Sequence, residues 1–131
     1  MDYIDDYNYI LTGHNAIDKQ HKVLFKLFDK CKAAIIDKNI GVVRIIVYDL
    51  IKYSLEHFRY EEESMIHLKY DKKSYEDHVM QHSLFKAKII EVTRRLDDLD
   101  DGLELLEFIR NWFVEHIQKI DQKFVNYYNS I

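Results

Sequence analysis

The chain has 131 residues, of which 47% are hydrophobic, so it is long enough for one domain with a substantial core. Its net charge is −4 and it has no basic block, which disfavours nucleic acid and anionic membranes as partners. It has no proline and only three glycines, a composition that favours long helices over a loop-rich or all-β fold.

The sequence also bears on where the protein works. No apolar run approaches the roughly 18 to 20 residues that a membrane span needs. Residues 1–6 are acidic and lack the pattern of a signal peptide. The single cysteine, Cys31, excludes an internal disulfide, and we interpret it as a small buried residue in a reducing compartment. We therefore expect a protein of the cytoplasm.

Four amphipathic segments follow an irregular N-terminal arm over residues 1–16. The arm is rich in tyrosine (Tyr3, Tyr7 and Tyr9), and we expect it to lie across an apolar face of the fold. Apolar residues then recur at alternating steps of four and three, which predicts helices over about 17–37, 42–66, 74–99 and 103–127. Short connections predict an all-α, up-down-up-down four-helix bundle and a single domain over residues 1–131.

The predicted connections are polar. We expect Asn39-Ile40-Gly41 to close the first helix. The acidic stretch 97–102 has two interpretations. It lacks the spacing of an EF-hand calcium loop, so we favour a solvated turn in which an aspartate caps the next helix.

Each predicted helix carries imidazole or carboxylate groups at core positions near one end. In an up-down-up-down bundle the start of the first and third helices meets the end of the second and fourth. These seven groups should therefore share one level of the bundle: His21, His57, Glu61, His78, His82, His116 and Asp121. A lone histidine in a core is more often structural, but buried charge is costly unless it is paired or bound to metal. The cluster therefore predicts a metal site.

Neighbouring polar residues fit this site less well. Asp121 is five residues after His116, about 140° further round a regular helix, so we expect it to flank the histidine instead of stacking on it. A carboxylate that bridges from the side could use this offset, as could a locally widened turn. Glu62 and Glu63 lie further round the helix than Glu61, and we interpret both as solvated. His14 and His67 fall outside the core positions, and we interpret them as surface or turn residues.

The number and type of groups limit the metal. Imidazole with some carboxylate suits iron, zinc, copper or nickel, and seven ligands are too many for one tetrahedral zinc. They suit two six-coordinate ions that share two carboxylates and an oxo or hydroxo bridge, with one coordination position left open. Di-iron oxidases use more carboxylates and a Glu-x-x-His motif. A histidine-rich pair is better suited to binding O₂ reversibly than to splitting it, although zinc or manganese could occupy the site instead.

The motifs around these residues resemble the hemerythrin family in its bacterial single-domain form. They are Ile17-Asp18-Lys19-Gln20-His21, His57-Phe58-x-x-Glu61, His78-x-x-x-His82 and Trp112-x-x-x-His116-Ile117-x-x-x-Asp121. The resemblance covers nearly the whole chain and all seven metal positions. The arm departs from it, because a tryptophan is common there in the family and this arm has only tyrosines.

The resemblance implies a cofactor of two iron ions. His78, His82 and His116 would hold one iron, His21 and His57 the other, and Glu61 and Asp121 would bridge them. O₂ would bind at the two-histidine iron. The residues implied for the O₂ pocket are Leu24, Phe58, Trp112 and Ile117, which would exclude water.

From the ligand set and the resemblance together, we expect a monomeric oxygen-binding protein that is not an enzyme and that serves oxygen storage, delivery or sensing. The main alternative is a di-iron enzyme on the same site, a peroxidase, an oxidase or a nitric-oxide-handling protein. A third possibility is a regulatory module, which would need a separate signalling partner.

Overall fold

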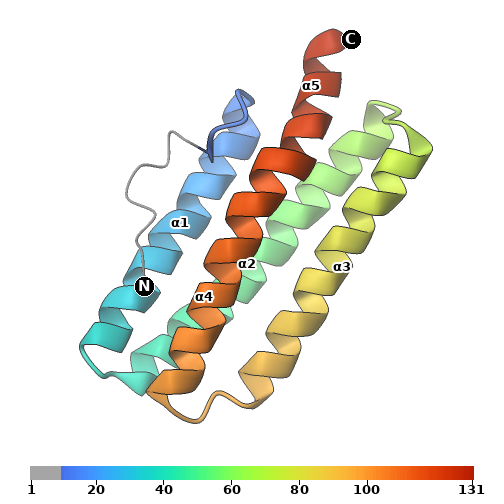
Figure 1. Ribbon diagram of the computed structural model, residues 1–131. Coiled ribbons are helices and arrows are strands. Elements are labelled where there is room, and N and C mark those ends of the chain that lie inside the picture. The colour runs from blue at the N-terminus through green and yellow to red at the C-terminus, as the bar shows by residue number, and fades with distance from the viewer. Residues whose placement is uncertain (1–9) are drawn as a thin grey trace.

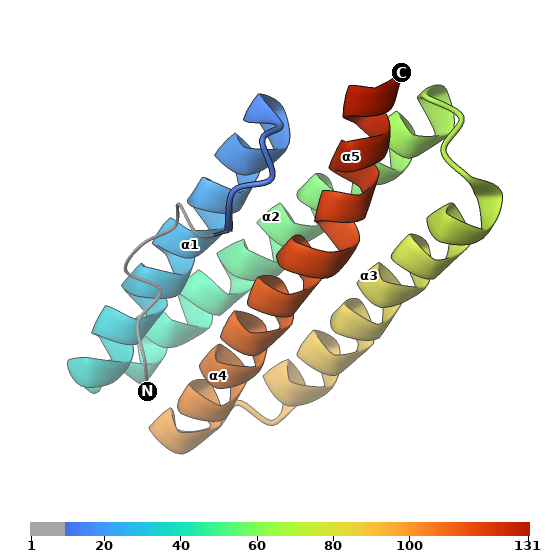
Figure 2. The same cartoon turned by 45° about the horizontal axis from the view of Figure 1, so that its top comes forward.

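All four predicted helices are present in the computed structural model, which describes residues 10–131 (Figure 1). They are α1 (Asn15–Ile36), α2 (Ile40–His67), α3 (Lys72–Arg94) and α4 (Leu99–His116). A π-helical turn, η2 (Ile117–Asp121), and α5 (Gln122–Ser130) continue α4 as one rod (Figure 2). The predicted up-down-up-down bundle is confirmed. Most of the arm, including Tyr3, Tyr7 and Tyr9, lies outside the described residues.

Helices α1 and α2 end in the same backbone conformation, in the turns that lead to α2 and α3. Lys38 and Lys69 both adopt positive φ, 57° and 55°. The next residue in each case donates its N–H five residues back, from Asn39 to Ala34 O at 2.9 Å and from Tyr70 to Met65 O at 2.9 Å. The prediction that Asn39-Ile40-Gly41 closes the first helix is therefore wrong in detail, because Lys38 ends α1 and Asn39 caps the start of α2.

The boundary between α3 and α4 also differs from the prediction. The helix predicted over 74–99 ends at Arg94, and the one predicted from 103 begins at Leu99. Asp98 caps α4 by accepting from the Asp101 N–H at 2.9 Å, and Asp101 Oδ2 accepts in return from the Asp98 N–H at 3.3 Å. This reciprocal cap confirms the solvated, capping turn and starts α4 inside the stretch predicted as a loop.

The interior divides into two apolar clusters. The larger one occupies the half of the bundle near the α1–α2 and α3–α4 turns and includes Phe28, Val47, Leu50, Ile89 and Leu105, all at most 2% exposed. The smaller one, formed by Ile17, Met65, Phe124 and Val125, closes the opposite end. Polar side chains are buried between the two clusters, at the level that the sequence predicted.

The described part of the arm is held against the start of α1. The Asp18 carboxylate accepts from Thr12 N at 2.8 Å, Thr12 Oγ1 at 2.7 Å and Gly13 N at 3.0 Å. Gly13 has φ of 94°, a conformation that residues with a side chain rarely adopt. Gln122 of α5 donates to Thr12 O at 3.1 Å, so this segment is hydrogen-bonded to both α1 and α5.

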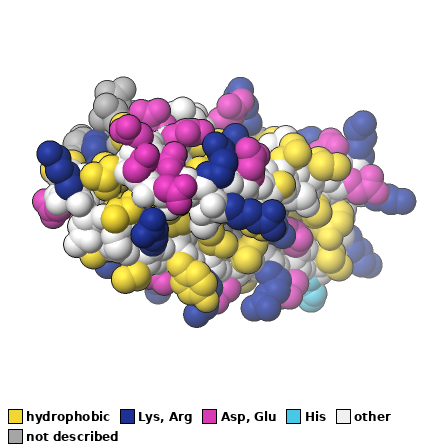
Figure 3. Space-filling view, turned by 90° about the horizontal axis from the view of Figure 1, so that it is seen from below, with side chains coloured by type: hydrophobic (Ala, Val, Ile, Leu, Met, Phe, Trp, Pro, Cys, Tyr) yellow, Lys and Arg dark blue, Asp and Glu magenta, His cyan; other side chains and the backbone are white. Residues whose placement is uncertain are grey.

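The surface is mixed in charge. Viewed from below, it shows a group of acidic side chains with lysine and arginine around them and hydrophobic side chains between (Figure 3). Among residues 10–131, no helix combines the length and the apolar character that crossing a membrane requires.

Candidate metal centre

The structure brings all seven predicted groups together in the interior. Each is at most 3% exposed, and they come from every long helix: His21 from α1, His57 and Glu61 from α2, His78 and His82 from α3, His116 from α4 and Asp121 from η2. Their ligand atoms form two sets in which every atom lies within 4.8 Å of the others. One set is Glu61, His78, His82, His116 and Asp121, and the other is His21, His57, Glu61 and Asp121.

Asp121 faces both sets with different oxygens. Its Oδ1 lies 2.9 Å from His78 Nε2 and 2.9 Å from His116 Nε2. Its Oδ2 lies 3.1 Å from His21 Nε2. A carboxylate with one oxygen turned to each of two imidazole groups is placed to bridge two cations.

Glu61 also lies between the two sets. Its Oε1 is 3.2 Å from His57 Nε2 and 3.4 Å from His82 Nε2. His57 is one helical turn earlier on the same face of α2, whereas His82 reaches the same oxygen from α3. The two carboxylates are thus the only members that belong to both sets.

The π-helical turn explains how Asp121 reaches the site. In a regular α-helix, residues five apart differ by about 140° around the axis. The turn from Ile117 to Asp121 is widened, and Gln122 N donates to Ile117 O, five residues back. Asp121 therefore lies over His116 and faces inward. The expectation that Asp121 only flanks His116 is therefore wrong, because the turn between them is widened.

Two residues that sequence reasoning did not assign to the site fix the orientation of its histidines. Gln20 Oε1 lies 2.6 Å from His57 Nδ1, and Glu62 Oε2 lies 2.8 Å from His82 Nδ1. Both oxygens accept, so each ring carries its proton on Nδ1 and turns the lone pair of Nε2 into the site. The interpretation of Glu62 as simply solvated is therefore wrong, since its side chain is 22% exposed and hydrogen-bonded.

The polar atoms that face the centre of the site fit a metal. Among the described residues, several buried atoms at the site have no hydrogen-bond partner. They are both carboxylate oxygens of Glu61, both carboxylate oxygens of Asp121, and Nε2 of His78, His82 and His116. His21 Nε2 and His57 Nε2 lie only 3.0 Å apart. Because leaving so many buried polar atoms unpaired is expensive, convergent lone pairs of this kind are typical of ligands around a cation.

The carboxylates stay ionised without metal. Burial acts to raise the pKa of Glu61, as does the charge of Asp121, but the surrounding imidazoles outweigh both and lower it to about 2. Burial likewise opposes ionisation of Asp121, yet His116 and its neighbours hold its pKa well below the usual range. Burial lowers the pKa of His116, which favours its neutral form. Burial acts to lower the pKa of His21 and of His82, but the nearby carboxylates outweigh it and raise both. Metal binding must therefore displace protons from these two rings, while the carboxylates are already in the form that binds metal.

Apolar and aromatic side chains cover the site on the side of the larger cluster. Phe58 stacks on the His82 ring at 4.0 Å between centroids, and Trp112 stacks on His116 at 4.2 Å. Phe58 and Trp112 also meet edge to face at 5.7 Å. Leu24 and Ile117 are at most 2% exposed in the same cluster. All four residues predicted for the O₂ pocket thus lie in one part of the interior.

The remaining polar candidates lie away from the site. Glu63 and His67 are exposed on α2, as predicted. His14 is half-buried and caps α1, where its Nδ1 accepts from Ile17 N at 3.2 Å. Its interpretation as a turn residue is confirmed.

The fold and the paired ligand sets define a metal-binding four-helix bundle. The profile of the Hemerythrin HHE cation binding domain family matches residues 12–128. The chain is 30% identical to myohemerythrin of Riftia pachyptila, over 86% of this chain and 83% of that protein. It is 29% identical to bacteriohemerythrin of Pseudomonas aeruginosa strain LESB58, over 93% and 77% respectively. Bacteriohemerythrin of Clostridium acetobutylicum is 28% identical, over 87% and 92%.

Solved structures agree on the fold. A crystal structure of a hemerythrin single-site mutant superposes with a TM-score of 0.78 at 22% identity, covering 95% of this chain and 93% of that one. This chain belongs to the hemerythrin family of HHE cation-binding domains. The family resemblance inferred from the sequence motifs is therefore confirmed.

Proposed function

We propose that this chain binds O₂ reversibly at a non-haem di-iron centre. His78, His82 and His116 would hold one iron, His21 and His57 would hold the other, and Glu61 and Asp121 would be shared by both. The observation that carries this proposal is the division of the seven groups into two sets that share both carboxylates. When bound in the ferrous state, the iron pair supplies the electrons that hold O₂. The family to which the chain belongs supports iron over zinc or manganese.

The protein side chains keep this chemistry reversible by excluding water. Phe58 is fully buried against the His82 ring, and Leu24 and Ile117 pack in the same apolar cluster. Gln20 and Glu62 hold His57 and His82 in the tautomer that exposes Nε2 to the site. Five imidazoles and only two carboxylates form the ligand set, a balance better suited to binding O₂ reversibly than to splitting it, so we propose that the protein is a carrier and not an enzyme.

The decisive experiment is metal analysis combined with absorption spectra in air and under argon. We expect two iron ions per chain and a visible absorption band in air that disappears when O₂ is removed under vacuum. Absence of iron after iron-replete expression would contradict the proposed centre. Rapid oxidation with steady turnover of an added reductant would instead favour the di-iron enzyme.

The apolar wall can be tested separately from the ligands. Ile117→Ala and Leu24→Ala remove buried methyl groups next to the site, so water should enter and autoxidation should be faster. The rate at which the oxy spectrum is lost measures this effect, with iron content as the control. Unaltered rates in both variants would reject the role proposed for the wall.

The physiological setting is part of the same proposal. Burial raises the pKa of the Cys31 thiol to about 11, which makes it a poor nucleophile and supports a structural role. We propose the cytoplasm as the compartment, because a single cysteine suits a reducing environment. We propose a monomer that stores, delivers or senses O₂. Light scattering of the purified protein tests the monomer.

A further inference from the structure

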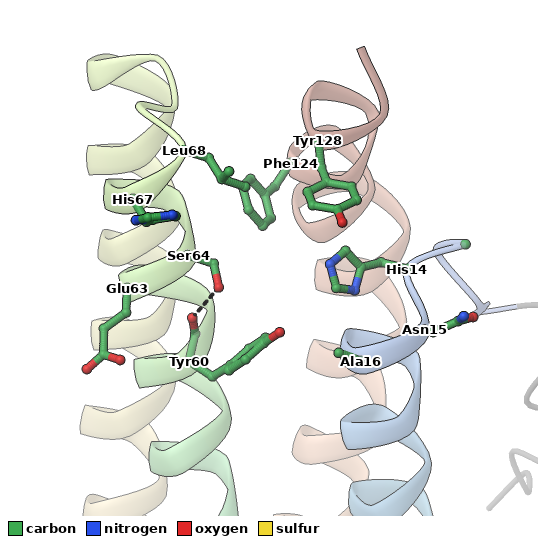
Figure 4. Close-up of a pocket in the computed structure, with 11 residues that line it drawn as sticks. His14, Asn15, Ala16, Tyr60, Glu63, Ser64, His67, Leu68, Phe124 and Tyr128 are labelled. Carbon is green, nitrogen blue, oxygen red and sulfur yellow. Dashed lines mark hydrogen bonds between the residues drawn. The ribbon is translucent and has the colours of Figure 1, made fainter. Parts of the chain in front are cut away.

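A cavity lies outside the metal centre at the same end of the bundle. It is about 740 Å³ in volume and is formed by the start of α1, the last turns of α2 and α5 (Figure 4). This volume is within the range of small-molecule sites in proteins, roughly 300 to 1,000 Å³. The smaller apolar cluster, Ile17, Met65, Phe124 and Val125, includes a residue that lines the cavity, Phe124, and a residue on the helix that carries Glu61, Met65. Met65 is one turn, about 6 Å along the axis, from Glu61.

The walls of this cavity are aromatic. Tyr60 projects from α2, whereas Phe124 and Tyr128 project from α5 (Figure 4). The His14 ring packs edge-on against Tyr128 at 4.6 Å between centroids. Phe124 has no exposed surface, so it forms the closed base of the cavity, and its ring packs edge-on against Tyr70 at 5.2 Å between centroids. Such walls favour a flat ring as the ligand.

The wall on the α5 side is also fixed in position. Tyr127 of α5 donates its hydroxyl to Leu68 O at 2.6 Å and to Lys69 O at 3.0 Å. These bonds tie α5 to the turn that follows α2. The two sides of the cavity are therefore held at a set separation, as a preformed site requires.

The polar groups that face the cavity are hydrogen-bond donors. His14 Nδ1 accepts from Ile17 N, so the ring carries its proton on Nε2. The hydroxyls of Tyr60 and Tyr128 make no hydrogen bond within residues 10–131. The Ser64 hydroxyl is already used, because it donates to Tyr60 O at 2.8 Å. Free donors thus stand on both sides of the cavity, Tyr60 on one and His14 with Tyr128 on the other (Figure 4).

The charge around the cavity restricts the ligand further. Among the described residues, its lining contains no lysine or arginine. Glu63 lies at its rim, on the outer side of α2 (Figure 4). An anionic ligand would therefore lack a positive partner and would meet a carboxylate. A neutral ligand with acceptor oxygens matches the donors without this repulsion.

We propose that this cavity binds a neutral, planar ring with carbonyl oxygens at opposite ends, a ligand of the quinone type. The ring lies between Tyr60 and Tyr128, which are 38% and 42% exposed, above the buried Phe124. One carbonyl accepts from Tyr60, and the other accepts from His14 or Tyr128. This binding does not depend on iron or on O₂, so its failure would leave the oxygen function untouched.

Duroquinone is a suitable probe, because its ring is fully substituted and cannot react with a thiol. Its methyl protons give a single NMR resonance, whose broadening on titration with the purified protein yields an apparent Kd. We expect saturable broadening. Its absence would overturn the proposal. Equally tight binding of durene, which lacks the carbonyls, or of 4-methylbenzoate, which is anionic, would overturn the ligand class.

Variants locate the binding. Tyr60→Phe and Tyr128→Phe each keep the ring and remove one hydroxyl, so each should weaken binding about two- to tenfold. Ala16→Trp fills the cavity and should abolish binding, with circular dichroism as the check on folding. Tyr48→Phe is the matched control, since Tyr48 is 68% exposed and does not line this cavity. Unchanged Kd in Ala16→Trp, or an equal loss in Tyr48→Phe, would contradict the assignment.

Discussion

The core-facing positions of α2 are Val43, Val47 and Leu50 in one half of the bundle, whereas His57 and Glu61 occupy the equivalent positions in the other. All five are at most 2% exposed. The first half buries hydrocarbon, which stabilises the fold through transfer from water and close packing. The second half buries charges and lone pairs, whose burial costs free energy until a cation binds them.

We therefore expect the apolar half to stabilise the bundle before any metal binds. The metal half can then keep its ligands unpaired and aligned, because the packing elsewhere holds the helices in register. If this division is correct, substitutions in the two halves should separate stability from metal binding.

The largest effect is expected from Glu61→Gln. The amide keeps the shape of the side chain but removes a charge that both ligand sets share, so iron content should fall by more than half. Metal analysis of the purified variant measures it. Glu63→Gln, two residues away and exposed, is the control and should keep its iron. Full iron content in Glu61→Gln would contradict the bridging role.

Leu50→Ala tests the other half. Leu50 is 1% exposed, and truncating a buried leucine costs about 2–5 kcal/mol. We expect a loss of this size in chemical denaturation, with the iron content of the folded protein unchanged. Leu55→Ala, at a position that is 42% exposed, should change stability by about 0.5 kcal/mol or less. A parallel loss of iron in Leu50→Ala would show that the halves are not separable.

Gln20→Leu should weaken metal binding without removing a ligand. It deletes the acceptor for His57 Nδ1, and losses of partners of this kind typically cost about 10- to 100-fold in metal affinity. Competition with a chelator measures the change. Glu62→Gln keeps an acceptor oxygen for His82 and should have a smaller effect. If Gln20→Leu retained iron as well as the parent protein does, Gln20 would have no role in supporting the metal site.

The smallest effect concerns the turn between α1 and α2. Lys38 has φ of 57°, a conformation that costs a residue with a Cβ about 1–2 kcal/mol. Lys38→Gly should therefore stabilise the protein, by about 1 kcal/mol or less, in thermal denaturation. Lys26→Gly, inside α1, should destabilise it by about 1 kcal/mol. Destabilisation by both variants would show that Lys38 makes contacts that outweigh its strained backbone.

Much of the fold and the set of converging residues could be predicted because both follow from periodicity. Four-and-three spacing places His21, His57 and His78 on core faces whatever the details of the turns. Short connections then bring those faces to one level. The ends of α3 and α4 could not be placed, since Asp98 and Asp101 are compatible with a loop or with a helix cap. Only their reciprocal hydrogen bonds decide between the two.

The contacts of Gln20 and Glu62 could not be predicted from sequence patterns, for a different reason. Each hydrogen bond joins two helices, α1 to α2 for Gln20 and α2 to α3 for Glu62. The rotation of each helix by a few tens of degrees decides whether such a pair meets. The aromatic cavity is similar, because its walls come from three segments and no spacing within one segment indicates it.

Because the turn between Ile117 and Asp121 is widened, the orientation of α5 depends more on the number of residues in this turn than on which residues they are. One extra residue rotates everything after it by about 100°, so the buried positions of Phe124 and Val125 in α5 depend on it as much as Asp121 does. Deleting Lys119, which is exposed, would change no candidate ligand and no core residue. The deletion would nevertheless convert the turn to a regular helix and rotate α5, so that its buried residues no longer face the interior. Both the iron centre and the cavity beside it would then be disrupted.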